Sequence, residues 1–303
     1  RRNCGGAFLI SQTLTLYTST DAKQLTFAGN VILTAGIMDC VSGAQPAVNI
    51  TVTGTSNVTG TLTLDSAAAT FTGNATINSG GIIQKNSSTG LVSIAGDVTN
   101  AGTFAHTGAG GTITQTVAAK QITTSTGTMQ LNGSSGNNIT INVQYSLIFN
   151  NASGTCNLQY VSINSQAATN DYTLQFNASP TLTNLDNCTI TKTAGGNSSM
   201  GVVGTAIGII TATNCTFAGT VGATWLTQHV SCTPVDGRVQ LSSCTYTAVG
   251  FQATGSWVAA ITDQGVANAT VYYGILNANS PAASYQIADA NNVTVRNANV
   301  YGT

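Results

Sequence analysis

The chain has 303 residues, of which 8 are Lys or Arg, 9 are acidic and 2 are His. Only 6% of them are charged, against roughly 25% in an ordinary soluble domain. All the acidic residues are Asp, whereas the chain holds 50 Thr, 33 Gly, 29 Asn and 25 Ser. Because Glu and Lys favour helices and Thr, Asn and Gly do not, the composition excludes a helical protein. The net charge of −1 also excludes a typical nucleic-acid binder, which needs a basic face.

Several features indicate an exported protein. No segment approaches the ~18 uninterrupted apolar residues of a membrane span, so no membrane insertion is expected. The chain begins Arg1-Arg2-Asn3-Cys4, and we interpret it as a mature exported chain whose signal has been removed. Seven cysteines without a CxxC pair disfavour a zinc site and suit an oxidising setting. We therefore expect an extracellular or cell-surface location, with no cofactor and no metal.

Residues 1–137 are predicted to be an N-terminal β region with less regular repeats. Leu62-Thr63-Leu64 and Ile113-Thr114 alternate an apolar residue with Thr, which is the pattern of a half-buried strand. Apolar positions here suggest coils shorter than those that follow, at Leu62–Leu64, Ile77, Val92–Ile94, Phe104 and Ile113. A β-solenoid and a β-sandwich both fit this region, because Greek-key strands also come with regular turn spacing.

Residues 138–303 are predicted to be a parallel β-solenoid. A frame of Asn, apolar, Thr and apolar recurs, as in Asn138-Ile139-Thr140-Ile141 and Asn187-Cys188-Thr189-Ile190. The last apolar residue of each frame falls at positions 141, 163, 190, 217, 246, 271 and 295. The steps of 22, 27, 27, 29, 25 and 24 residues lie within the range of repeat architectures, and the unit contains strands and turns but no helix. Each repeat is interpreted as one coil.

One stretch resembles a known class of proteins. Gly96-Asp97-Val98-Thr99-Asn100-Ala101-Gly102-Thr103-Phe104 is similar in style to the repetitive β-helical passengers of bacterial surface adhesins and autotransporters. The resemblance extends over about half of the chain. It implies a right-handed β-helix that is used outside the cell for adhesion or assembly.

The repeated frame also predicts which side chains face the core. Alternate residues of a strand face opposite ways, so Cys188 and Ile190 should point inward while Asn187 and Thr189 point outward. The same register places Cys215, Phe217, Cys244, Tyr246, Val271 and Val295 in the core.

Each frame is also an N-x-[ST] glycosylation sequon. The outward Asn residues could carry glycans, with turn sites favoured, or could stack as ladders of hydrogen-bonded amides along the axis. The candidate glycosylation sites are Asn49, Asn57, Asn74, Asn86, Asn132, Asn138, Asn151, Asn177, Asn187, Asn197, Asn214, Asn268 and Asn292.

Six cysteines are candidates for disulfides. Cys188, Cys215 and Cys244 occupy the same place in consecutive coils, so two of them could bond, or all could pack as a ladder of free thiols. Cys232 could bridge to Cys244. Cys4 could pair with Cys40 or crosslink to another subunit.

The sequence gives little support to catalysis, and we expect no enzyme. The Asp residues are spread almost one per coil, whereas glycoside chemistry needs paired carboxylates. One dense group, Trp225, His229, Asp236 and Arg238, could bind or cleave a sugar or could be a loop fastened by an ion pair. His106 is interpreted as a solvated turn residue in a Gly-rich run.

These features predict a structural subunit of an extracellular filament, sheath or fibre that is glycosylated and contacts surface glycans or the cell envelope. Strand-like sequence near both ends of the chain predicts head-to-tail contacts with further copies of the chain, and hence a homopolymer. The alternative is a β-helical carbohydrate-active enzyme or a sugar-binding spike.

Overall fold

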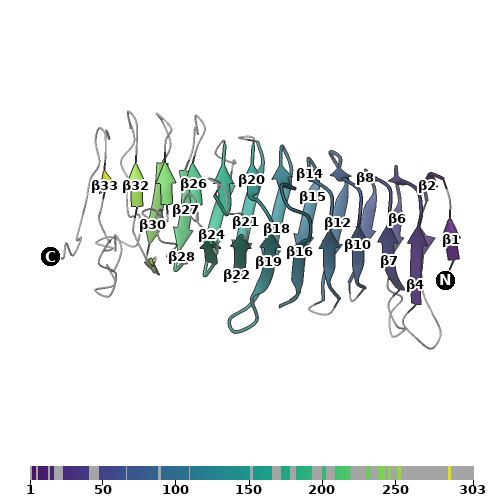
Figure 1. The fold of residues 1–303 in the computed structure, drawn as a ribbon, viewed down its shortest axis with the longest axis horizontal. Coiled ribbons are helices and arrows are strands. Elements are labelled where there is room, and N and C mark those ends of the chain that lie inside the picture. The colour runs from purple at the N-terminus through teal and green to yellow at the C-terminus, as the bar shows by residue number, and fades with distance from the viewer. Residues whose placement is uncertain are drawn as a thin grey trace.

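The structure is a computed structural model of the chain, and it contains one elongated stack of strands with β1 near one end and β33 near the other (Figure 1). The described residues are 2–4, 6–12, 14–16, 23–40, 48–65, 67–87, 90–108, 110–150, 153–165, 172–177, 182–192, 200–202, 209–219, 230–232, 238–242, 245–246, 251–253 and 286–287.

The described strands form three parallel sheets, and each coil of the chain adds one strand to each sheet in turn. Sheet A contains β1 (Arg2–Cys4), β4 (Lys23–Phe27), β7 (Val48–Val52), β10 (Ala69–Phe71), β13 (Val92–Ile94), β16 (Thr112–Gln115), β19 (Ile139–Val143), β22 (Val161–Ser165), β25 (Thr189–Lys192), β28 (Thr216–Gly219) and β31 (Thr245–Tyr246). Sheet B contains β2 (Phe8–Ile10), β5 (Val31–Leu33), β8 (Ser56–Val58), β11 (Ala75–Ile77), β14 (Val98–Asn100), β17 (Ile122–Thr124), β20 (Leu147–Phe149), β23 (Leu174–Phe176), β26 (Met200–Val202), β29 (Val230–Cys232), β32 (Phe251–Ala253) and β33 (Gln286–Ile287). Sheet C contains β3 (Leu14–Thr15), β6 (Ile37–Asp39), β9 (Thr61–Thr63), β12 (Ile82–Lys85), β15 (Thr103–His106), β18 (Thr128–Asn132), β21 (Thr155–Gln159), β24 (Leu182–Asp186), β27 (Ile209–Thr213) and β30 (Arg238–Ser242). The predicted β-solenoid is therefore confirmed.

The predicted register of the repeat is confirmed where the structure describes it. Ile141 pairs with Ile163, which pairs in turn with Ile190 in sheet A. Phe217 and then Tyr246 continue this row. The markers at 271 and 295 lie outside the described residues.

The solenoid also extends through residues 1–137, so the β-sandwich alternative is wrong for the strands described there. Sheet A runs from β1 through β16 to β19 by parallel pairing. Successive partners between Leu25 and Ile141 are 25, 19, 23, 21 and 28 residues apart. Most of these coils are shorter than those after residue 163, as the sequence predicts.

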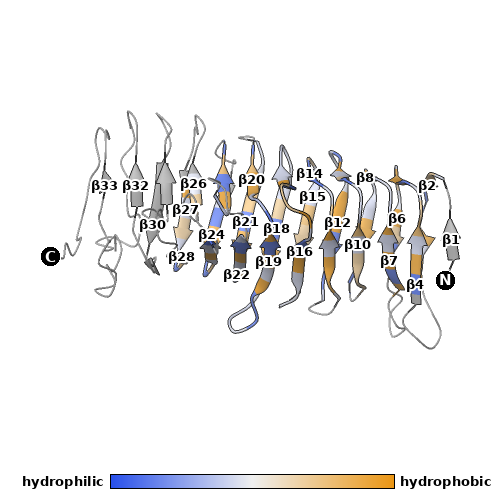
Figure 2. Cartoon of the chain, viewed as in Figure 1, coloured by the Kyte–Doolittle hydropathy of each residue, from blue (hydrophilic) through white to orange (hydrophobic). Residues whose placement is uncertain are grey.

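The alternation of apolar and polar residues produces the core. In most strands the inward residues are fully buried and the residue between them is only half-buried, and Figure 2 shows the same mixture of apolar and polar positions along the described strands. Cys188, Ile190, Cys215 and Phe217 are each at most 1% exposed. The intervening Thr189 and Thr216 are half-buried. The predicted inward register is confirmed at these positions, whereas the side chains of Cys244, Tyr246, Val271 and Val295 lie outside the described residues.

Glycines form two ladders at the corners of the solenoid. Between sheets A and B, a Cβ on Gly96 would lie 2.3 Å from the carbonyl oxygen of Gly73, and one on Gly73 would lie 2.4 Å from that of Gly54. Between sheets B and C, Gly102 and Gly127 approach the coil before them equally closely. The backbones of neighbouring coils therefore contact one another at these corners, where only glycine fits.

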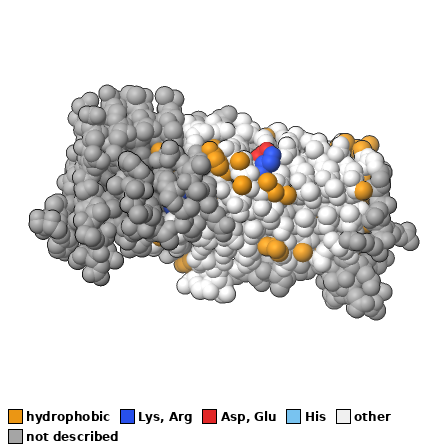
Figure 3. Space-filling view, in the orientation of Figure 1, with side chains coloured by type: hydrophobic (Ala, Val, Ile, Leu, Met, Phe, Trp, Pro, Cys, Tyr) orange, Lys and Arg blue, Asp and Glu red, His pale blue; other side chains and the backbone are white. Residues whose placement is uncertain are grey.

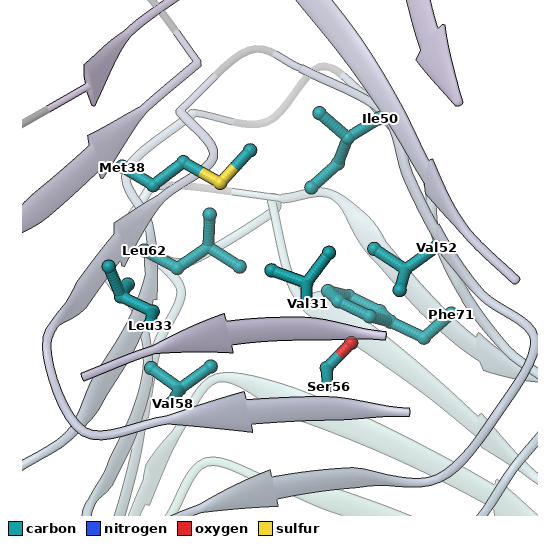
Figure 4. Close-up of a pocket in the computed structure, with 9 residues that line it drawn as sticks. All are labelled: Val31, Leu33, Met38, Ile50, Val52, Ser56, Val58, Leu62 and Phe71. Atoms are coloured by element: carbon teal, nitrogen blue, oxygen red, sulfur yellow. The ribbon is translucent and has the colours of Figure 1, made fainter. Parts of the chain in front are cut away.

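A small apolar void lies in the core of the first coils, and Figure 4 shows the polar side chain of Ser56 among its otherwise apolar lining. The Ser56 hydroxyl is buried and has no hydrogen-bond partner. The residues that line the void are Val31, Leu33, Met38, Ile50, Val52, Ser56, Val58, Leu62 and Phe71.

Candidate functional site

The outer face of sheet A is a regular surface of the described chain. Its side chains form two rows, because the parallel register places like residues of successive coils side by side. One row contains Thr112, Thr140, Ser162, Thr189 and Thr216. The other contains Thr26, Thr51, Thr70, Ser93 and Thr114. Because paired strands of neighbouring coils lie about 4.8 Å apart, successive side chains in each row have the same spacing. The face offers hydroxyl groups and carries no charge at these positions.

Amide side chains connect coils on the outer faces. Asn164 donates from Nδ2 to Oδ1 of Asn142 at 3.2 Å on sheet A, and Asn184 donates likewise to Asn157 at 3.1 Å on sheet C. Such bonds join one coil to the next without charge. Amide bonds therefore connect neighbouring coils, but these four Asn residues are not the frame residues for which the sequence allows a ladder.

The structure divides the sequon residues by exposure. Asn74, Asn86 and Asn214 are exposed. Asn49, Asn57, Asn132, Asn138, Asn177 and Asn187 are half-buried. Asn151, Asn197, Asn268 and Asn292 lie outside the described residues.

Several half-buried sequon amides are held by hydrogen bonds. Asn138 donates from Nδ2 to Oγ of Ser162 at 3.2 Å, and Asn187 donates from Nδ2 to Oδ1 of Asp186 at 2.7 Å. Asn177 bonds in the same way to Asn150. The nitrogen to which a glycan would be attached thus already donates one hydrogen bond at each of these three sites.

The first residue of the repeated frame has a conformational role that the sequence analysis did not assign. Asn187 and Asn214 have φ of 51° and 52°, and Tyr160 at the same corner has φ of 49°. Asn tolerates this left-handed conformation better than most residues. The two Asn residues therefore belong to turns before β25 and β28, which corrects their expected place within the strands.

The described cysteines of the core form no disulfide with one another. Cys40, Cys156, Cys188 and Cys215 are buried and unbonded to one another. The Cys188 thiol donates to the carbonyl oxygen of Leu158 at 3.2 Å, and the Cys215 thiol donates to that of Leu185 at 3.4 Å.

Two of the disulfides that the sequence leaves open are not formed. Neither a Cys188–Cys215 bridge nor a Cys4–Cys40 bridge is formed, and the thiol ladder is the alternative that the structure supports. Burial, with the Asp39 charge as a smaller cause, raises the pKa of the Cys40 thiol to about 12. The side chains of Cys4, Cys232 and Cys244 lie outside the described residues.

The predicted sugar-binding group cannot be placed. Trp225, His229 and Asp236 lie outside the described residues, and Arg238 is described only as the first residue of β30.

Three basic side chains, those of Lys85, His106 and Lys192, are buried in the described part of the solenoid, where the sequence analysis expected none. Lys85 and His106 lie on neighbouring strands of sheet C. Lys85 is 2% exposed, and its Nζ donates to the carbonyl oxygen of Asp65 at 2.5 Å and of Ala67 at 3.5 Å. His106 is 0% exposed, and neither ring nitrogen has a hydrogen-bond partner. The expected solvated turn at His106 is therefore wrong, since the residue ends β15 on the inward side.

The period-2 rule could have found both residues. Ile83 and Phe104 are inward apolar residues, and two positions later on the same side of the strands come Lys85 and His106. The Gly-rich neighbourhood of His106 obscured this signal.

Burial changes the titration of both groups. Desolvation, with the Lys85 charge as a smaller cause, lowers the pKa of His106 from 6.5 to about 4. Desolvation also lowers the pKa of Lys85 from 10.5 to about 8, although the Asp65 carboxylate partly opposes this.

Within the residues that the structure describes, no three His, Cys or Asp side chains gather closely enough to hold a metal ion. The same residues include no helix of the length and hydropathy that a membrane span requires. Comparisons with family models, with curated proteins and with solved structures found no match to this chain.

Proposed function

We propose that this chain is a structural subunit of an extracellular filament, sheath or fibre, and that its copies assemble head to tail along the solenoid axis. The observation that carries the proposal is the continuity of the three parallel sheets, whose strands are paired in register from coil to coil. Backbone hydrogen bonds run along the axis in such a stack, so its stiff direction is its length. A load-bearing rod needs this arrangement.

The outer surface supports the same role. The space-filling view shows a described face made mostly of backbone and of side chains that are neither charged nor hydrophobic, with hydrophobic side chains in small separate groups and one charged cluster (Figure 3). Hydroxyl rows and amide ladders cover this surface in place of charges. Such a face suits contact with neutral partners, including glycans and further copies of the chain.

Electron microscopy of the concentrated protein, combined with analytical ultracentrifugation, tests the assembly. We expect unbranched filaments whose length increases with protein concentration. Deleting residues 1–17, which removes β1, β2 and β3, should give a folded protein that forms no filaments. Thr99→Lys, which places a charge on the exposed outer side of β14, is the matched control and should still polymerise. A full-length chain that stays monomeric at high concentration contradicts the proposal and favours the enzyme or sugar-binding alternative.

We further propose that the native protein carries N-linked glycans at its exposed sequons. Asn74, Asn86 and Asn214 are exposed, whereas Nδ2 of Asn138 and of Asn187 already donates a hydrogen bond. Glycans would hold water on a surface that has few charges. Mass spectrometry of protein from its native source should find higher occupancy at the three exposed sites. Unmodified peptides at all three sites would contradict the proposal.

A further inference from the structure

One inward column of sheet C contains two of the buried basic residues, Lys85 and His106. Lys85 pairs with His106, which pairs with Leu131, and the column continues through Leu158 to Leu185. All five side chains are buried. The coils after His106 therefore show that Leu fills this position well. Packing alone does not require a Lys or a His here.

His106 lacks the hydrogen-bond partners that usually stabilise a buried polar side chain. Both ring nitrogens of His106 are without a hydrogen-bond partner, which is costly for a buried group. Lys85 is held by two backbone carbonyl oxygens. The charged groups that bear on His106 are Lys85 in β12 and, next to Lys85, Asp65 after β9. On the other side, β18 presents the apolar Leu131.

We propose that the Lys85–His106 step is an acid-sensitive joint of the solenoid, at which protonation of the buried imidazole opens the pairing between β12 and β15 while distant coils stay folded. An imidazolium here would be desolvated, without an acceptor, and beside the Lys85 ammonium. Each coil of a solenoid interacts mainly with its neighbours, so the opening of the β12–β15 pairing can remain local. A rod with this joint loses mechanical continuity in acid.

The direction of the effect follows from linkage. The folded state binds the His106 proton only near pH 4, whereas the opened state binds it near pH 6.5. Folding stability from this group is therefore complete at neutral pH and declines as the pH falls below 6.5. From these pKa values the opening equilibrium constant increases about 20-fold between pH 7 and pH 5. Lys85 remains charged in this window, because its pKa is about 8.

Hydrogen exchange followed by mass spectrometry tests the proposal, after correction for the pH dependence of intrinsic exchange. In the full-length wild type, peptides from β12 and β15 should exchange about 20-fold faster at pH 5 than at pH 7, while peptides from β19 and β22 change little. His106→Leu, which restores the apolar column, should abolish most of this acceleration. Subtracting the two data sets removes any contribution of His229, which both proteins share.

Two further measurements keep the test decisive if His106→Leu does not fold. Lys85→Met should reduce the ratio of exchange rates between pH 5 and pH 7, because it removes the like charge, whereas Lys120→Met, at a surface ion pair with Asp97, should not. The wild type contains only two His residues. In its NMR titration, one imidazole should stay neutral down to about pH 5 in the folded protein. Titration of both imidazoles near pH 6.5, or equal acid sensitivity in all coils, overturns the proposal.

Discussion

At the residue scale, Ser56 shows how a single polar atom affects this core. Its side chain lies inward between Val31 and Ala75 of the neighbouring coils, and its hydroxyl has no partner. Ser56→Ala removes a desolvated hydroxyl, so we expect the free energy of unfolding to increase by about 1 kcal/mol. Urea denaturation measures the change.

Ser165 provides the matched control for this prediction. It is equally buried, but its hydroxyl donates to the carbonyl oxygen of Tyr145 at 2.8 Å. Ser165→Ala breaks this bond and should lower the free energy of unfolding by about 1 kcal/mol. If both variants change the free energy of unfolding in the same direction, the missing hydrogen-bond partner of Ser56 is not what makes its hydroxyl destabilising.

The side on which a residue lies could be predicted from the sequence wherever a strand was recognised. Cys188, Ile190 and Phe217 lie inward as predicted, because the pleat allows only two orientations. His106 was misplaced because glycines around it suggested a turn, and a local pattern does not show that a neighbouring coil covers the residue. The bonding of Cys188 and Cys215 was also open, since neighbouring thiols in a column can either bond or pack.

At the scale of the element, the corners determine how closely coils can stack. Gly96 touches the backbone of Gly73, whereas Gly80, with φ of 81°, has open space around its Cβ position. Gly96→Ala must push two coils apart, and we expect it to lower the free energy of unfolding by about 3 kcal/mol. Gly80→Ala meets only left-handed backbone strain, and should cost about 1–2 kcal/mol. Thermal unfolding of the two variants checks the order, and an equal or smaller loss for Gly96→Ala would contradict the ladder.

The coils after residue 138 could be predicted because, among the described residues, each frame lies at a strand of sheet A, from Ile141 to Tyr246. Before that point the frame occurs in different sheets. Asn49 lies in β7 of sheet A, whereas Asn74 directly precedes β11 of sheet B. Spacings between such frames do not measure whole coils. The corner glycines mark which residues of successive coils are equivalent, since Gly54, Gly73 and Gly96 lie at the same corner of three consecutive coils. Their spacing varies with coil length, which hides the repeat from a search for a fixed period.

For the whole molecule, the coil is the unit that can be added or removed. Val92 pairs with Ile113 in sheet A, so deleting residues 92–112 removes one coil and lets β16 take the place of β13 beside β10. The shortened chain should fold, because each coil depends mainly on its nearest neighbours. Its denaturant slope should decrease in proportion to the surface lost, and its circular dichroism should keep the strand signal.

The matched control deletes residues 92–102, which is about half of the same coil. This deletion rotates the rest of the chain onto the wrong sheet, so that sheet A strands after the cut meet sheet B strands before it. The inward rows then no longer align across the cut, and apolar side chains of one part lie against corners of the other. We expect this protein to aggregate or to unfold in two separate transitions. If both deletions unfold alike, the stability of the rod does not depend on coil register.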